Sequence, residues 1–135
     1  MKYKYGNRSE RVLSEVQSDL QLLAREMLAM GIVDIAAICG RRGKAAQEKA
    51  FNVGHSNARW GQSKHNVEVP ELSNALDLAP LINGKIPWKE TDIGFEYWYI
   101  MGGMAMVIAK KLSLNIRWGY YFKLKDLPHF EIMEV

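Results

Sequence analysis

The stretch at residues 75–84, ALDLAPLING, decides the fold. Its first half, Ala75–Ala79, is a short apolar run typical of a buried strand, and Pro80 is expected to end that strand. Asn83-Gly84 is a strong turn dipeptide between apolar residues. Asp77 lies between two leucines, and an unpaired carboxylate buried among apolar side chains is costly. We therefore expect a buried strand whose single acidic side chain is paired or bound.

The segments on both sides of this strand carry helical patterns. Upstream, apolar residues recur at helical spacing after the capping pair Ser18-Asp19, and Gly31 is expected to end that helix. Downstream, residues 91–112 are predicted to form a long helix capped at Thr91 or Asp92. This helix contains Gly102-Gly103, and each glycine costs about 1 kcal/mol of helix propensity. We therefore expect a neighbouring element to pack closely against the two glycines.

The other segments alternate short strands and helices. The predicted elements are a short helix near Ser9, a strand at Val33–Cys39, a helix at Gly43–Val53, a loop at His55–Pro70, and strands at Asn115–Trp118 and His129–Met133. Helices that precede and interrupt a few short strands predict an α+β fold with a small antiparallel sheet. A structureless loop as long as the one expected at residues 55–70 is uncommon unless it is functional.

Composition and charge limit the class of protein. The 135 residues fit one domain, and 48% hydrophobic with 24% charged residues exclude a disordered chain. The single cysteine, Cys39, excludes an intramolecular disulfide framework. The net charge is +3, and no run of Lys and Arg exceeds two residues, so a nucleic-acid partner is not expected. Residues 97–109 are the most apolar stretch but fall short of the roughly 20 residues of a spanning helix, so stable membrane insertion is not expected.

Histidines and carboxylates supply the candidate chemistry. Two of the three histidines, His65 and His129, have polar or acidic neighbours, whereas His55 is expected to be exposed and inert. Together with Asp77 and Asp126 they form the inventory of a zinc hydrolase, which uses three protein ligands, a coordination position open to water and a nearby carboxylate base. Residue type alone does not establish a zinc site, because two histidines and two acids occur by chance in most chains of this length.

Three motifs resemble the signature of zinc peptidases that cut peptidoglycan stem peptides. This family includes D-alanyl-D-alanine carboxypeptidases, vancomycin-resistance dipeptidases and bacteriophage lysins that are L-alanyl-D-glutamate endopeptidases. The motifs are Ser63-Lys64-His65, Ala75-Leu76-Asp77 and Asp126-Leu127-Pro128-His129. Further similar segments are the opening helices at 9–28, Cys39-Gly40-Arg41-Arg42 with Gln47, Leu78-Ala79-Pro80, Arg117-Trp118-Gly119 and His129-Phe130-Glu131. The resemblance covers nearly the whole chain and implies the α+β fold of zinc D-Ala-D-Ala peptidases and Hedgehog-like domains.

The resemblance also implies a role for each matching residue. The implied zinc ligands are His65, Asp77 and His129. Asp126 would be the general base that takes a proton from the attacking water, and Arg42 would orient the substrate or stabilise negative charge. The residues expected to support the site or contact substrate are Ser63, Gln47 and Glu131. Two alternatives stay open, namely Glu131 as the base and Arg41 in place of Arg42.

Two departures from the family pattern bear on these expectations. His65 and Asp77 are separated by a longer gap than usual, in which residues 67–72 resemble an insertion. Ser73 also stands where the family usually has a glycine. The segment at Tyr120–Phe122 replaces an acidic-aromatic pair and a longer loop, so the preferred substrate is open.

The expected function follows from the resemblance. We expect residues 1–135 to form a single zinc peptidase domain of bacteriophage origin, without a separate wall-binding domain. Its expected partner is the peptidoglycan stem peptide, with the L-Ala–D-Glu bond as the favoured target, and it is expected to be a monomer. With no signal peptide evident, we expect synthesis in the host cytoplasm and release to the wall by a holin-type helper. The alternatives are a D-Ala–D-Ala carboxypeptidase or dipeptidase and a non-catalytic wall-binding module with a degenerate site.

Overall fold

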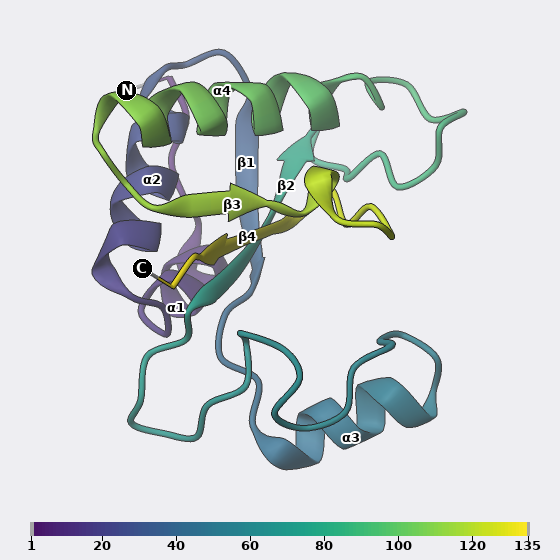
Figure 1. Cartoon of the computed structure of the whole chain (residues 1–135). Coiled ribbons are helices and arrows are strands. Elements are labelled where there is room, and N and C mark those ends of the chain that lie inside the picture. Colours follow the sequence, from purple (N-terminus) through teal and green to yellow (C-terminus); the bar gives the residue numbers. More distant parts are fainter. Residues whose placement is uncertain (1, 135) are drawn as a thin grey trace.

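The computed structural model describes residues 2–134 and contains a four-stranded antiparallel sheet in the order β1-β2-β4-β3 (Figure 1). The strands are β1 (Asp34–Cys39), β2 (Ala75–Leu81), β3 (Ile116–Trp118) and β4 (His129–Ile132). The helices are α1 (Asn7–Leu13), α2 (Ser18–Ala29), α3 (Lys44–Asn52), α4 (Tyr97–Lys111) and a single 3-10 turn, η1 (Gly119–Tyr121). The predicted α+β fold is confirmed. None of the helices in the part of the chain that the structure describes is long and apolar enough to cross a membrane.

One face of the sheet forms the core. Leu76 of β2 pairs with Phe130 of β4, and Phe130 pairs in turn with Trp118 of β3, so these side chains share a face. All three are buried, and α4 and α2 pack against this side (Figure 1). The opposite face carries Asp77 of β2, Arg117 of β3, and His129 and Glu131 of β4. In Figure 1, α3 and the long loop after it lie apart from the core, beyond one end of the sheet.

Helix α2 is the element that the sequence predicts best. It runs from Ser18 to Ala29, and Gly31 follows it with a positive φ of 69°. The predicted capping by Ser18 and Asp19 is wrong, because the N-cap residue is Gln17 and no side chain caps this helix with a hydrogen bond. The apolar positions at helical spacing are all buried, namely Leu20, Leu23, Ala24, Met27 and Leu28. A strong 3.6-residue period with a glycine at its end was sufficient here, because the helix has a single buried face.

Strand β2 was predicted to end at Pro80, but it continues through the proline to Leu81. Backbone N–H groups alternate between the two edges of a strand, and Leu78 donates toward the β4 side, to the carbonyl of Pro128. Pro80 therefore faces that same side. The pairing with β4 ends at Asp77 and His129, so no ladder bond is lost where the proline lacks its N–H.

Helix α4 begins at Tyr97 rather than at Thr91 or Asp92. Gly94 has a φ of 86°, and its Cα packs against Ile82, which interrupts any helix through this position. Asp92 accepts a hydrogen bond from the backbone N–H of Lys89 at 2.9 Å, so it closes an earlier turn instead of capping the helix. The short helix expected near Ser9 is α1, which begins at Asn7, and the Ser9 hydroxyl accepts a hydrogen bond from the Ala37 N–H of β1 at 3.0 Å.

The glycine pair of α4 predicts opposite effects on stability. A methyl group at Gly102 would overlap the Trp118 ring, whereas one at Gly103 meets open space. We expect Gly102→Ala to destabilise the protein by about 1–3 kcal/mol through overpacking, and Gly103→Ala to stabilise it by up to about 1 kcal/mol. Urea unfolding of both variants measures the difference. Equal changes in the free energy of unfolding would contradict the close contact with Trp118.

Candidate metal centre and catalytic cleft

Strand register gathers the candidate side chains on the polar face of the sheet. Asp77 of β2 is paired with His129 of β4 on one side and with Cys39 of β1 on the other. A β-bulge between Ala37 and Cys39 brings Cys39, in place of Ile38, opposite Asp77. Directly opposed residues lie on one face, so three potential ligands from three strands stand side by side.

His65 reaches this row from the long loop. Its Nε2 lies 3.0 Å from Asp77 Oδ1, and His129 Nδ1 lies 3.3 Å from the same oxygen. Both histidines are buried, and their ring centroids are 5.0 Å apart. Two imidazole nitrogens therefore converge on one carboxylate oxygen.

The second nitrogen of each ring is fixed by an acceptor. His65 Nδ1–H donates to the Gly40 carbonyl at 2.7 Å, and His129 Nε2–H donates to Glu131 Oε1 at 2.8 Å. Neither acceptor carries a hydrogen to donate, so each of these two nitrogens carries a proton. His65 Nε2 and His129 Nδ1 are left facing Asp77. In metal sites, an acceptor bonded to the far nitrogen of a histidine orients the ring in this way.

Charge and hydrogen bonding shift the pKa values of this cluster. Burial opposes the charged forms, but the charge of His65 and hydrogen bonds from both rings hold the pKa of Asp77 well below its usual value. The same contacts raise the pKa of His65 and of His129. Glu131 has its pKa lowered to about 2, against the effect of burial, by the hydrogen bonds of His129 and Arg117 and by the charge of Lys64.

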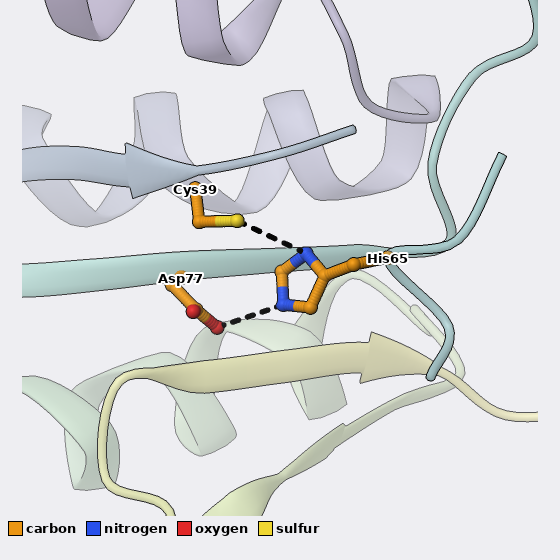
Figure 2. Close-up of side chains that lie close together, drawn as sticks. All are labelled: Cys39, His65 and Asp77. Carbon is orange, nitrogen blue, oxygen red and sulfur yellow. Dashed lines mark hydrogen bonds and ion pairs between the residues drawn. The ribbon is translucent and has the colours of Figure 1, made fainter. Parts of the chain in front are cut away.

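Two sets of donors could hold a cation here. Cys39, His65 and Asp77 place ligand atoms within 4.8 Å of one another. Figure 2 shows, however, that the thiol and the carboxylate meet different nitrogens of the His65 ring, with Cys39 Sγ 3.7 Å from Nδ1. That nitrogen is already bonded to the Gly40 carbonyl. The alternative set is His65 Nε2, Asp77 Oδ1 and His129 Nδ1, in which both nitrogens lie within 3.3 Å of the same carboxylate oxygen. A cation bound by these atoms would replace the protons that now link the two rings to the carboxylate.

Asp126 stands beside this set. Its Oδ2 lies 3.9 Å from His129 Nδ1, and its side chain is half exposed. Partial burial and the nearby charge of Asp77 raise the pKa of Asp126. A carboxylate with a raised pKa next to a candidate metal centre has the properties of a general base.

The backbone of Asp126 is held by Gly119. The Asp126 N–H donates to the Gly119 carbonyl at 3.0 Å, and a side chain at Gly119 would overlap the Asp126 backbone. Trp118 closes the same loop by donating from Nε1 to the Leu127 carbonyl at 2.8 Å. The close approach at Gly119 thus sets where the carboxylate stands relative to His129.

This contact predicts a catalytic effect of Gly119→Ala. The methyl group must push the Asp126 backbone away, and a misplacement of about 1 Å can cost about 100-fold in rate. We expect kcat to fall by about that factor with KM little changed and the metal retained. Gly103→Ala, which also adds one methyl group but in open space, should leave kcat unchanged. An unaltered kcat in Gly119→Ala would show that Asp126 needs no such support.

Arg42 and Gln47 form the opposite wall. Arg42 donates from its backbone N–H to the His65 carbonyl at 2.8 Å, and its guanidinium lies 3.2 Å from Gln47 Oε1 and 3.4 Å from Cys39 Sγ. Gln47 is fully buried and donates to Ser56 Oγ and to the Ala58 carbonyl. Gln47 therefore ties Arg42 to the loop that lines the cleft. Arg41, the open alternative, points elsewhere and donates to the Glu71 carbonyl.

The insertion at residues 67–72 supports this wall. Glu68 accepts a hydrogen bond from the Lys44 N–H at the start of α3, and Glu71 accepts the one from Arg41. Ser63 accepts the His65 N–H at 3.2 Å, so it steadies the backbone of the histidine. The longer gap between the first histidine and Asp77 is compatible with the site, because the extra residues brace α3 and do not separate the ligands.

These elements surround a cleft of about 950 Å³. Its lining includes all the expected ligands together with Arg42, Ser63, Asp126 and Glu131. It also includes residues that sequence analysis did not assign to the site, among them His55, Arg117, Phe122, Lys123, Leu124 and Lys125. Only the altered segment at 120–122 pointed toward the last four of these. Sequence alone gave no sign that Cys39 stands beside His65.

Comparisons with known proteins show what this chain is similar to. Residues 1–133 match the model of a family described as phage L-alanyl-D-glutamate peptidase. The L-alanyl-D-glutamate peptidase of Escherichia phage T5 is 29% identical over 132 residues, which is 98% of this chain and 90% of that protein. The crystal structure of the Serratia marcescens L-Ala D-Glu endopeptidase ChiX superimposes with a TM-score of 0.76 at 25% identity, covering 96% of this chain and 90% of the other.

Proposed function

The chain belongs to the family of phage L-alanyl-D-glutamate peptidases, and we propose that it hydrolyses the amide bond between L-Ala and D-Glu in the peptidoglycan stem peptide. The observation that supports this most strongly is the convergence of His65 Nε2 and His129 Nδ1 on one oxygen of Asp77. A peptidase that activates water with a metal needs such a ligand set, with a coordination position left open toward a cleft.

We propose zinc as the metal and His65, Asp77 and His129 as its ligands. Two imidazoles and one carboxylate suit zinc, and the acceptors at Gly40 and Glu131 orient both rings. Zinc bound there would supply Lewis acidity, lowering the pKa of a water molecule to about 7 and polarising the scissile carbonyl.

In this proposal, two further side chains transfer the proton and stabilise the developing negative charge. Asp126, half exposed beside His129, accepts a proton from the attacking water and returns it to the departing amine. Arg42, held by Gln47, directs its guanidinium into the cleft and binds the carbonyl oxygen as negative charge develops. Glu131 does not serve as the base, because His129, Arg117 and Lys64 already surround its carboxylate.

The proposal extends to where and in what form the protein acts. We propose that residues 1–135 work as one catalytic domain and as a monomer. The site of action is the cell wall, reached from the host cytoplasm with the help of a holin-type protein.

Defined muropeptides test the proposed bond. Incubation with a stem peptide should release a fragment with D-Glu at its amino terminus, which mass spectrometry identifies. Release of D-Ala from the carboxyl terminus instead would make the protein a carboxypeptidase of the same fold. Binding of the stem peptide without any cleavage would make it a wall-binding module.

A further inference from the structure

The cleft carries more positive than negative side chains. Three carboxylates line it, namely Asp77, Asp126 and Glu131. Five cationic side chains line it, namely Arg42, Lys64, Arg117, Lys123 and Lys125. Because two of the carboxylates are already bonded to histidines or cations, the surplus positive charge favours an anionic ligand.

Four of the five cations are held by the protein itself. Arg42 contacts Gln47, and Lys64 donates to the Ile132 carbonyl at 2.6 Å. Arg117 pairs with Glu131 at 3.1 Å and lies over the Phe122 ring. Lys125 donates to the Tyr120 carbonyl at 3.0 Å and lies 3.7 Å from the centre of the Tyr120 ring.

Lys123 differs from these four. Its side chain is exposed, and among residues 2–134 its ammonium group has neither an ion pair nor a hydrogen bond. The residues on either side of it are nevertheless held in the cleft wall by contacts of their own. Phe122 packs its ring against His129, with centroids 5.4 Å apart, and Lys125 is fastened to Tyr120. Lys123 is thus a cleft-lining cation without a partner among the described residues, next to Phe122, whose ring lies against His129.

The family's substrate offers a matching anion. Glutamate has two carboxyl groups, and only one of them continues the peptide chain, so the other is free. This free carboxylate belongs to the residue whose nitrogen leaves when the bond breaks. Asp126, the proposed proton carrier for that nitrogen, lies three residues after Lys123 in the same loop.

We propose that Lys123 recognises the free carboxylate of the D-Glu residue and makes the protein selective for stem peptides in which this group is not amidated. The inference rests on the proposed function, since it concerns the residue next to the proposed scissile bond. It gives Lys123 a role in substrate specificity, while Arg42 keeps its proposed role of stabilising the negative charge that develops on the carbonyl oxygen.

Two synthetic stem peptides test this role. One has the free carboxylate on D-Glu, and the other has a carboxamide at the same position. We expect the wild-type protein to show a kcat/KM about tenfold higher for the free acid, as a hydrogen bond to a charged group would give. Lys123→Gln should lose this preference by slowing the acid alone, and Lys123→Arg should keep it.

Lys89→Gln is the matched control, because Lys89 is exposed on the loop between β2 and α4, outside the cleft. It should retain the wild-type preference. Equal rates on the two peptides for the wild type, or an equal loss on both in Lys123→Gln, would overturn the inference while the peptidase function stands. Cleavage of neither peptide between L-Ala and the following residue would overturn the proposed function and the inference together.

Discussion

Asp126→Asn should retain the metal and the fold but lose about 100- to 10,000-fold in kcat, the range typical of a lost general base. The amide has nearly the same size as the carboxylate, so the loop anchored at Gly119 can keep its shape. The asparagine amide, however, cannot accept a proton from water. Hydrolysis of a defined muropeptide, with metal content measured on the same sample, gives the result.

Glu131→Gln is the matched control for this experiment. Glu131 is the other carboxylate near His129, and its amide replacement can still accept the hydrogen bond from His129 Nε2. We expect a smaller loss of kcat than in Asp126→Asn. If Glu131→Gln were the more damaging change, and Asp126→Asn nearly harmless, the general base would be Glu131.

His129→Ala should lose the metal and all measurable hydrolysis, whereas Cys39→Ala should retain about one metal ion per chain. His129 Nδ1 faces the same Asp77 oxygen as His65 Nε2, so removing it takes away one of three proposed ligands. Cys39 Sγ instead approaches the His65 nitrogen that donates to Gly40. Metal analysis of the two purified variants separates the two candidate sets of ligands.

The opposite pattern would assign the metal to Cys39, His65 and Asp77. In that case Cys39→Ala would come without metal, and His129→Ala would retain it. His129 would then act through its hydrogen bond with Glu131.

Elements with one strong local signal could be predicted from the sequence. Helix α2 has a clear apolar period and a terminal glycine. The glycine pair of α4 indicated close packing by a neighbouring element, which is found at Gly102, against Trp118, but not at Gly103. Features set by tertiary context were missed. Pro80 is tolerated in β2 because β4 is too short to pair with it, and α4 starts late because Gly94 packs on Ile82.

In the candidate site, too, the features with a local sequence signal were predicted and those set by tertiary contacts were not. The motifs around His65, Asp77 and His129 indicated which side chains should meet, and the strand register places Asp77 opposite His129. The bulge that turns Cys39 toward His65 depends on the pairing of β1 with β2, which no local pattern encodes. The support of Asp126 by Gly119 is likewise a contact between backbones in space.

Purified peptidoglycan, treated with the protein before and after chelation, tests the central claim most directly. We predict about one zinc ion per chain and new amino-terminal D-Glu in the digest, with both lost on chelation and both restored by added zinc. New amino-terminal D-Glu at an undiminished rate in the metal-free protein would contradict metal-dependent cleavage at this site. Zinc-loaded protein that releases no D-Glu termini would contradict the proposed bond.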